Sequence, residues 1–344
     1  MITHSRVVLD DDDLSSVLEV LKTGQLVQGE KVLSLERALA SFIGVKHAVA
    51  VSSGTAALHL ALLALGIGEG SEVILPSFVC PALLNAVHYV RATPALVDID
   101  PDTYNISVSQ IEKALSHRTA AIIVPHMFGL SADTDAILSF NIPVIEDCAQ
   151  SVGATLKGKY AGSFGAMSIF SFYATKMLCA GEGGAILSND DDLIGHARDL
   201  RDYDEKETYA LRYNYKLTDI QAVLAESQLK NLPSFIEKRR HMARVYSAAL
   251  EGIVSRLPVA PEEKKHIYYR YVIPIDNSAR FIDKMNEQEV QCRRPIFRPL
   301  HRFLKLSGYK VTEDAWSKSV SIPIYPSLTE SDAYRIVDAI RKSI

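Results

Sequence analysis

From residue 48 onward, short apolar runs alternate with segments long enough to form a helix, and this pattern limits the possible folds more than any other feature. The apolar runs predict strands at 48–53, 72–76, 95–100, 120–125, 143–148, 167–173 and 184–188. Helical patterns lie between most of them, at 55–65, 83–90, 109–116 and 133–139. Runs so continuously apolar are typical of strands buried on both faces. We therefore expect βαβ units and a mainly parallel sheet covered by helices.

The remaining third of the chain has a different character. A helical pattern extends from about Thr218 to Leu250, and we expect a break near Pro233 because proline lacks a backbone N–H. An apolar run at 268–275 and a helical pattern at 278–286 follow. With 344 residues, two domains are expected. We predict an α/β fold with a large domain at 1–240 and a smaller α+β domain at 241–344.

Composition excludes several classes of protein. The 37 Lys and Arg against 41 Asp and Glu give a net charge of −4, which argues against non-specific binding to nucleic acid. The longest apolar stretch, 56–67, contains His59 and is shorter than the ~20 residues of a membrane helix. The N-terminus also lacks the basic-then-apolar order of a signal peptide. Four scattered cysteines without a C-x-x-C pair indicate free thiols and no metal site. We predict a cytoplasmic protein that contacts neither nucleic acid nor membrane.

Three segments carry groups suited to chemistry. In the first, Ser53, Gly54 and Thr55 follow a predicted strand and begin a helix. The N–H groups at a helix start bind anions, particularly beside hydroxyl groups. Serine and threonine at such a position also cap helices, so this segment alone is compatible with either role.

The second segment ends a predicted strand with Asp147. Open α/β sheets bind ligands at the carboxyl ends of their strands, although an aspartate there can also be a simple cap. Glu146 is its neighbour, and adjacent strand residues point to opposite faces. We therefore expect only Asp147 to face a ligand.

The third segment places Lys176 after a predicted strand, close to the hydroxyl groups of Ser171 and Thr175 and before the glycine-rich run 181–184. A lysine amine held in a site is a nucleophile toward aldehydes. A solvated loop lysine is the alternative. Pyridoxal phosphate requires all three features together: an anion cradle, an acid at its pyridine nitrogen and a lysine. A nicotinamide enzyme is disfavoured, because no strand leads into G-x-G-x-x-G.

The sequence resembles the DegT/DnrJ/EryC1/StrS family of pyridoxal-phosphate-dependent sugar aminotransferases. The matching motifs include VIEDCAQSVGA, SFYATK and RYNYKLTDIQA, and they recur in family order over roughly 24–231. The resemblance implies a fold-type I, aspartate aminotransferase-like fold and a homodimer with shared active sites. It also implies that Lys176 forms the Schiff base and moves protons, and that Asp147 pairs with the pyridinium. The further cofactor contacts that it implies are Ser53, Gly54, Thr55, Ser171, Gln150 near the 3′ oxygen, and Asn214 from the neighbouring subunit.

The sequence departs from the family pattern at two places. Where the family has an aromatic residue stacked on the cofactor ring, this chain has Cys80, with Phe78 two residues earlier. Either Phe78 or Cys80 is therefore expected to pack on the ring. The family's N-Y-R reads Asn214-Tyr215-Lys216, which keeps the charge but loses the guanidinium fork.

Two other features each have two interpretations. A basic stretch is either a solvated surface or a contact for the diphosphate of a nucleotide sugar; it comprises Arg293, Arg294, Arg298, His301 and Arg302. His126, in a matching position, is either a core residue or a substrate contact.

Together these features predict an aminotransferase that moves an amino group, from L-glutamate, to a keto-sugar attached to a nucleotide, as in polysaccharide biosynthesis. Two alternatives remain. One is a dehydratase or epimerase that uses the same cofactor on nucleotide sugars, and the other is a regulatory homologue without turnover. Lys176 favours amino transfer, since dehydratase relatives carry histidine there.

Overall fold

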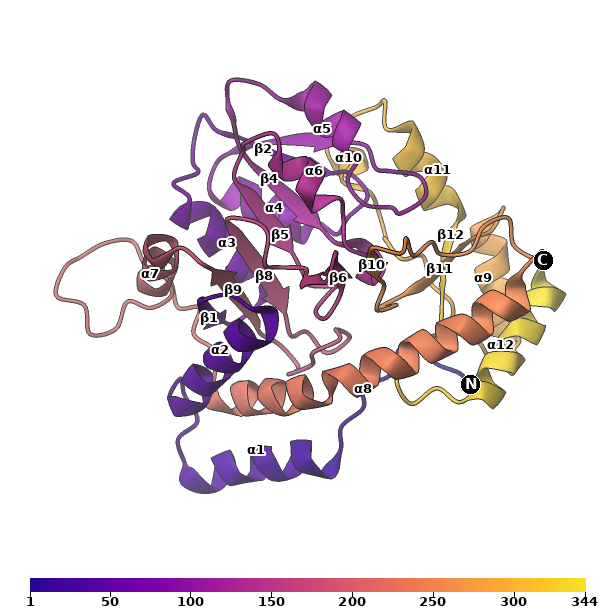
Figure 1. Cartoon of the computed structure of the whole chain (residues 1–344), viewed down its shortest axis with the longest axis horizontal. Coiled ribbons are helices and arrows are strands. Elements are labelled where there is room, and N and C mark those ends of the chain that lie inside the picture. The colour runs from indigo at the N-terminus through magenta and orange to yellow at the C-terminus, as the bar shows by residue number, and fades with distance from the viewer.

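A seven-stranded sheet forms the centre of the computed structural model, which describes residues 1–344 (Figure 1). The strand order is β1-β9-β8-β5-β4-β2-β3. Strands β3, β2, β4, β5 and β8 are mutually parallel, whereas β9 runs antiparallel to both β8 and β1. The strands are β1 (His47–Val51), β2 (Glu72–Pro76), β3 (Thr93–Val97), β4 (Thr119–Pro125), β5 (Val144–Asp147), β8 (Met167–Ser171) and β9 (Gly184–Ser188). The predicted α/β class with a mainly parallel sheet is confirmed.

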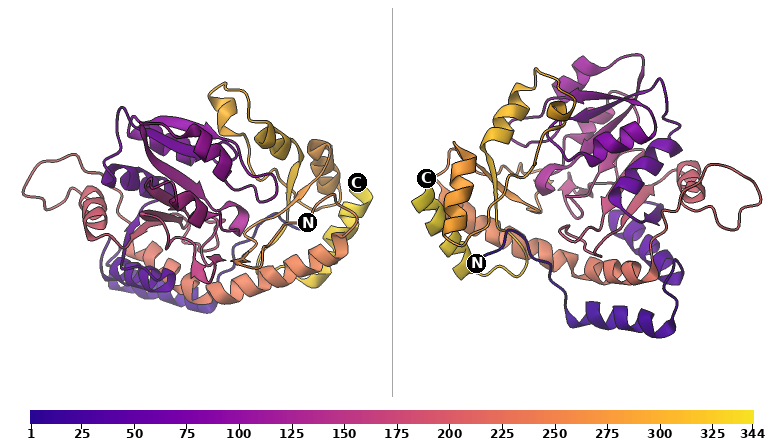
Figure 2. Two further views of the ribbon diagram at one scale, coloured as in Figure 1. Left: turned by 45° about the horizontal axis from the view of Figure 1, so that its top comes forward. Right: turned by 180° about the vertical axis from the view of Figure 1, so that it is seen from behind.

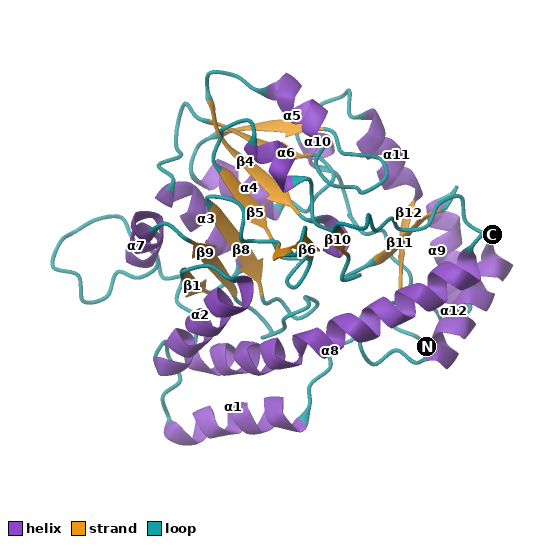
Figure 3. Cartoon of the chain, in the orientation of Figure 1, coloured by secondary structure: helices purple, strands orange, loops and turns teal.

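Helices cover both faces of this sheet (Figure 3). They are α1 (Asp11–Thr23), α2 (Glu30–Ile43), α3 (Gly54–Ala64), α4 (Ala82–Tyr89), α5 (Val108–Ala114), α6 (Thr134–Leu138), α7 (Asp191–Leu200) and α8 (Asp219–Leu250), with the 3₁₀ turn η1 (Met127–Gly129). In β4, Ile123 packs into the cluster containing α3 and α4. Its neighbours Ile122 and Val124 pack into the cluster containing α5 and α6. Burial on both faces explains why apolar residues at successive positions make up most of these strands.

A second body follows the sheet, next to both chain termini (Figure 2). It contains β11 (Tyr271–Pro274), β12 (Ser319–Ile322), α9 (Ser278–Glu287), α10 (Leu300–Phe303), α11 (Lys310–Lys318) and α12 (Glu330–Ser343). A small sheet of β10 (Lys264–Lys265), β6 (Thr155–Leu156) and β7 (Lys159–Tyr160) joins the two parts of the chain. Ile2 pairs with Val290 and packs into the core of the second body.

Helix α8 connects the two bodies and is continuous over 32 residues. The predicted break at Pro233 is therefore wrong. Pro233 is exposed, whereas Leu232 and Phe235 on either side of it are buried. Contacts with α1, α2 and α12 support the helix along its length, which compensates for the hydrogen bond that proline cannot donate. The predicted domain boundary at 240 falls inside this helix and stays a prediction.

Two other predictions concern the chain as a whole. All four cysteines are free, as their spacing indicated. In addition, none of the helices combines the length and the apolar character that a bilayer-spanning segment requires.

We expect Pro233→Ala to stabilise the protein. The alanine N–H can donate to the Leu229 carbonyl, and the exposed proline ring contributes no packing that would be lost. The free energy of unfolding in urea should rise, by up to ~3 kcal/mol. The neighbouring exposed change Ser234→Ala is the control and should have little effect. A lower stability of Pro233→Ala would mean that α8 depends on a proline-induced bend.

Candidate active site

The carboxyl ends of two neighbouring strands bring together the acid and the lysine that the sequence singled out. Asp147 ends β5, and Lys176 lies in the turn that follows β8, the strand paired with β5. Asp147 is only 7% exposed, and its carboxylate accepts the Ala149 N–H at 2.9 Å. Burial raises the pKa of Asp147, although that hydrogen bond and the charge of Lys176 act in the opposite direction. A buried carboxylate of this kind favours a cationic partner.

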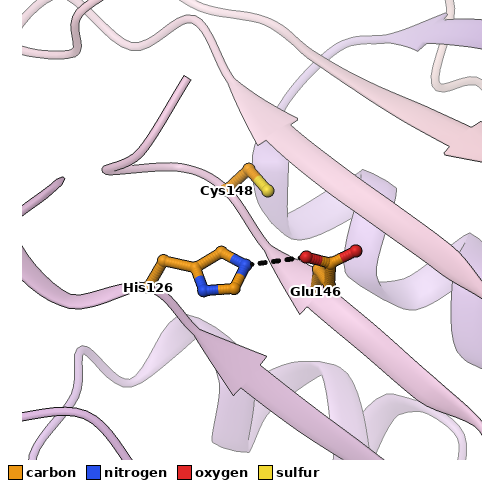
Figure 4. A group of neighbouring side chains, drawn as sticks. All are labelled: His126, Glu146 and Cys148. Carbon is orange, nitrogen blue, oxygen red and sulfur yellow. Dashed lines mark hydrogen bonds and ion pairs between the residues drawn. The ribbon is translucent and has the colours of Figure 1, made fainter. Parts of the chain in front are cut away.

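Glu146 points to the other side of β5, as alternation along a strand predicts (Figure 4). Its carboxylate accepts the N–H groups of Gly162, Phe164 and Gly165 at 2.7–2.9 Å and pairs with His126 Nε2 at 2.9 Å. Burial alone would raise the pKa of Glu146, but these hydrogen bonds hold it below its ordinary value. Glu146 therefore fastens loop 162–165 to the back of the strand that carries Asp147.

His126 is a core residue. It is 1% exposed, and its Nδ1 accepts the Ala132 N–H at 3.0 Å, so Nε2 carries the proton donated to Glu146. Its backbone N–H also donates to the Asp147 carbonyl at 3.2 Å. Cys148 lies within 4.8 Å of the same ring and carboxylate (Figure 4). The ring and the carboxylate are already hydrogen-bonded within the protein. We therefore assign this cluster a structural role, which is to fix the end of β5.

The predicted anion cradle lies at the start of α3. Ser53 caps this helix by accepting the Ala56 N–H at 3.0 Å, and Thr55 lies in the first turn. A Cβ on Gly54 would lie 2.9 Å from the Ser171 Cβ, and one on Gly184 would lie 2.7 Å from the Gly54 nitrogen. Glycine at both places therefore lets the helix N-terminus approach the ends of β8 and β9. The N-terminus of α3 thus lies beside the Ser171 side chain, and N–H groups next to a hydroxyl suit a phosphate.

Phe78 and Cys80, the two candidates for the ring contact, lie in different surroundings. Phe78 is fully buried, and its ring packs 5.8 Å from Tyr104 and 6.4 Å from Phe128. Cys80 is exposed. Desolvation and the Asp147 carboxylate raise the pKa of its thiol, and Lys176 lowers it. Of the two, Cys80 is therefore the residue beside the acid and the lysine.

Gln150 and Asn214 differ in how the fold holds them. The Gln150 Oε1 accepts the Phe128 N–H at 3.1 Å, which ties the amide to the loop after β4.

Asn214 is exposed in the segment between α7 and α8, part of which projects from the body (Figure 1). The N–H groups of Tyr213 and Tyr215 bind the carbonyls of Leu200 and Arg201. Asn214 thus lies between two anchored tyrosines.

Tyr269 is a candidate site residue that the sequence analysis missed. The Lys176 Nζ lies 5.4 Å from the centre of its ring. The segment around Tyr269 packs on Gly129, where a Cβ would lie 2.9 Å from the Tyr269 nitrogen. Burial acts to raise the pKa of Tyr269, but Lys176 and Arg270 outweigh it and lower the pKa to about 8. Only its place in the apolar run at 268–275 could have pointed to it.

Some residues of the basic stretch 293–302 bind other side chains, and others form no ion pair. The His301 Nδ1 pairs with Ser77 Oγ at 2.6 Å, and Arg302 binds Glu313. The guanidinium carbons of Arg294 and Arg302 lie 4.4 and 3.8 Å from the centre of the Trp316 ring. Arg293 and Arg298 are exposed and take part in no ion pair. His301 therefore ties the second body to the loop that carries Cys80.

Comparison with known proteins decides the family. The model of the DegT/DnrJ/EryC1/StrS aminotransferase family matches residues 8–341. The chain belongs to this family. It is 35% identical to the GDP-perosamine synthase of Caulobacter vibrioides, covering 96% of this chain and 95% of the relative. It is also 35% identical to a UDP-N-acetyl-3-dehydro-alpha-D-glucosamine 3-aminotransferase of Acidithiobacillus ferrooxidans, with 98% and 95% covered.

The fold agrees with this assignment. The crystal structure of the aminotransferase TlmJ from Streptoalloteichus hindustanus superposes with a TM-score of 0.94 at 29% identity, covering 100% of this chain and 98% of TlmJ. The predicted family, the fold-type I architecture and the enzyme class, an aminotransferase, are thereby confirmed.

We expect Glu146→Gln to destabilise the protein. An amide accepts at one oxygen only, so some of the four donors around it lose their partner, at roughly 2–3 kcal/mol. The pKa of Glu146 is lowered in the folded protein. Its charge therefore contributes its full stabilisation at any pH above the ordinary glutamate pKa of 4.5. This contribution is lost as the pH falls through the folded-state pKa. Urea unfolding from pH 7 down to pH 3 should therefore show the gap to wild type closing in acid. A gap that does not change with pH would contradict the ionised state of Glu146.

Proposed function

We propose that this chain is a pyridoxal-phosphate-dependent aminotransferase that moves an amino group from L-glutamate to the keto group of a nucleotide-linked sugar. The observation that carries the proposal is the facing pair of Asp147 and Lys176 at neighbouring strand ends, with the helix N-terminus at Gly54 beside Ser171. Membership of an aminotransferase family supports the reaction type. The names of the two relatives, which specify a GDP-linked and a UDP-linked sugar, support the acceptor class.

The residues present fit pyridoxal phosphate. Asp147 is a buried carboxylate with one hydrogen bond and a raised pKa, and a protonated pyridine nitrogen would supply the missing cation. The α3 N-terminus, Thr55 and Ser171 would hold the phosphate. The thiol of Cys80, beside Asp147, would lie against the ring in place of the usual aromatic residue. When bound, the cofactor supplies an electron sink for the carbon that carries the amino group.

Each of these residues then has a defined task. The Asp147 carboxylate would keep a proton on the ring nitrogen, and the Lys176 Nζ would hold the cofactor and move a proton on and off the reacting carbon. Tyr269 packs beside the Lys176 Nζ and limits its positions. Gln150, fixed by its hydrogen bond from the Phe128 N–H, would present its amide to the ring in one orientation.

The same proposal includes the acceptor, the assembly and the location. The unpaired Arg293 and Arg298 suit the diphosphate of the nucleotide sugar. We further propose a homodimer in which the exposed Asn214 contacts the cofactor phosphate of its partner. Free cysteines and a nucleotide-linked substrate support a cytoplasmic location.

We expect Lys176→Ala to remove turnover while the protein stays folded. No other amine is available beside Asp147 to hold the cofactor covalently or to move the proton. The measurement is amination of a panel of nucleotide keto-sugars with L-glutamate, together with the visible absorbance of the bound cofactor. Wild type should lose that absorbance when glutamate is added and regain it with the correct keto-sugar. Turnover by the alanine variant at saturating cofactor would contradict the role of Lys176.

Co-expression of two inactive variants tests the shared site. Lys176→Ala removes the lysine, and Asn214→Asp places a carboxylate where it repels the phosphate. In a mixed dimer, one site combines an intact Lys176 from one chain with an intact Asn214 from the other, so activity should return. If Asn214 serves its own chain, every site carries a lesion and no activity returns. Differential tags confirm that mixed dimers have formed.

A further inference from the structure

A small cavity of about 120 Å³ adjoins the turn that carries Lys176. It lies between residues 174–177, the N-terminal segment 5–8 and the middle of α8. Its cationic lining comes from Arg6, Lys176 and Arg239, and its neutral polar lining comes mainly from Thr175 and Gln228. No carboxylate lines the cavity, so its charge is positive and unbalanced.

Arg239 is the most unusual of these cations because it is buried without an acid. It is 6% exposed, and its Nη1 donates to the carbonyls of Tyr268, Tyr269 and Ile324 at 2.8–3.3 Å. Its Nε is buried and has no hydrogen-bond partner. Arg201, which is equally buried, pairs with Glu36 at 2.7 Å. A buried guanidinium normally has such a carboxylate partner.

Further cations surround the same region. The Arg270 guanidinium carbon lies 5.1 Å from the centre of the Tyr269 ring, and Lys176 Nζ lies 5.4 Å from it. Burial together with Arg270, Arg293 and Arg239 lowers the pKa of His4 to about 3. Neither Arg270 nor Arg293 takes part in an ion pair. Arg239, Arg270 and Arg293 thus carry positive charge that no ion pair offsets, and Asp147 is the acid that acts on Lys176.

One acid, Asp13, is close to the cavity; its Oδ2 is engaged, and its Oδ1 is buried without a hydrogen-bond partner. Asp13 is buried behind Gln228, whose amide binds its carboxylate, and it also accepts the Asp10 N–H at 3.1 Å. Gln228 therefore separates Asp13 from the cavity that it helps to line. The Arg239 guanidinium is therefore held by backbone carbonyls alone, with its Nε unpaired and no carboxylate partner from this chain.

We propose that this cavity binds the side-chain carboxylate of a dicarboxylic amino-acid donor, held between Arg239 and Arg6. The inference rests on the proposed function, since the amino group of the donor must reach Lys176. A volume of 120 Å³ holds roughly four waters, which is room for a carboxylate and the methylenes beside it. The Arg239 guanidinium lines the cavity without a carboxylate partner, and it would supply the charge-assisted hydrogen bond that a carboxylate accepts. The site would prefer glutamate to alanine as a donor.

Binding of glutarate to the cofactor-loaded enzyme tests the site without turnover. Glutarate carries two carboxylates and no amine, and butyrate is the matched monocarboxylate. By calorimetry, Arg239→Gln and Arg6→Gln should each weaken glutarate binding at least tenfold. Arg240→Gln is the control, because Arg240 is adjacent on α8 and pairs with Glu237 at the surface. Its glutarate affinity should equal that of wild type.

Two further variants keep the proposal open to refutation if Arg239→Gln does not fold. Arg239→Lys keeps the charge but loses the Nε donor. The double variant Arg6→Gln/Arg239→Lys should bind glutarate more weakly than Arg239→Lys alone. Arg6 is exposed, so Arg6→Gln is expected to fold. Glutarate affinity within twofold of wild type in the folded variants would overturn the proposal. A loss of nucleotide diphosphate binding in place of a loss of glutarate binding would also overturn it.

Separate measurement of the two half-reactions distinguishes this proposal from the proposed function. Arg6→Gln should raise the KM for L-glutamate about tenfold, leave that for L-alanine unchanged and leave the keto-sugar half-reaction intact. If wild type aminates sugars while the variants bind glutarate normally, the donor site fails and the proposed function stands. If no keto-sugar is aminated while glutarate binding depends on Arg239, the donor site stands and the acceptor assignment fails.

Discussion

Burial of the central sheet on both faces is the constraint on which the rest of this structure depends. Helices on both faces require connections that return each strand in the same direction, so the carboxyl ends of β4, β5 and β8 meet at one edge. Asp147 and the turn with Lys176 are neighbours for this reason, although 28 residues separate them. The antiparallel strand β9 then returns beside β8 and places Gly184 against Gly54.

A buried polar cluster, in which the Glu146 carboxylate and the His126 ring are hydrogen-bonded, fixes the edge of the sheet on the face opposite to Asp147. Glu146 accepts four hydrogen bonds on the face of β5 opposite to Asp147, and His126 ties β4 to the same strand. Such a cluster is stable in a low-dielectric interior only when every member is paired. Asp147 presents the contrasting case, because its carboxylate is buried with a single hydrogen bond. The first arrangement holds the backbone, and the second leaves an acid ready for a cationic partner.

The second body completes the site from the far end of the chain. Helix α8 carries Arg239 from the sheet side toward the second body, where its guanidinium binds the carbonyls of Tyr268, Tyr269 and Ile324. Tyr269 reaches Lys176 from that segment, and His301 binds Ser77 just before the Cys80 loop. Lys176 thus lies between a buried acid and several cations that have no ion-pair partner. Such a positive surrounding attracts an anionic amino-group donor and an anionic acceptor.

By itself the sequence determined the α/β class, the strands of the central sheet and the family, and it predicted Lys176 and Asp147 as the central site residues. These follow from local patterns, since apolar runs mark buried strands and the motifs are contiguous. It could not show that α8 continues through Pro233, because packing along the helix outweighs a local propensity. Nor could it distinguish Cys80 from Phe78, or bring Tyr269 and Arg239 to Lys176. Only the tertiary structure decided these points, because burial and charge depend on contacts between residues far apart in the chain.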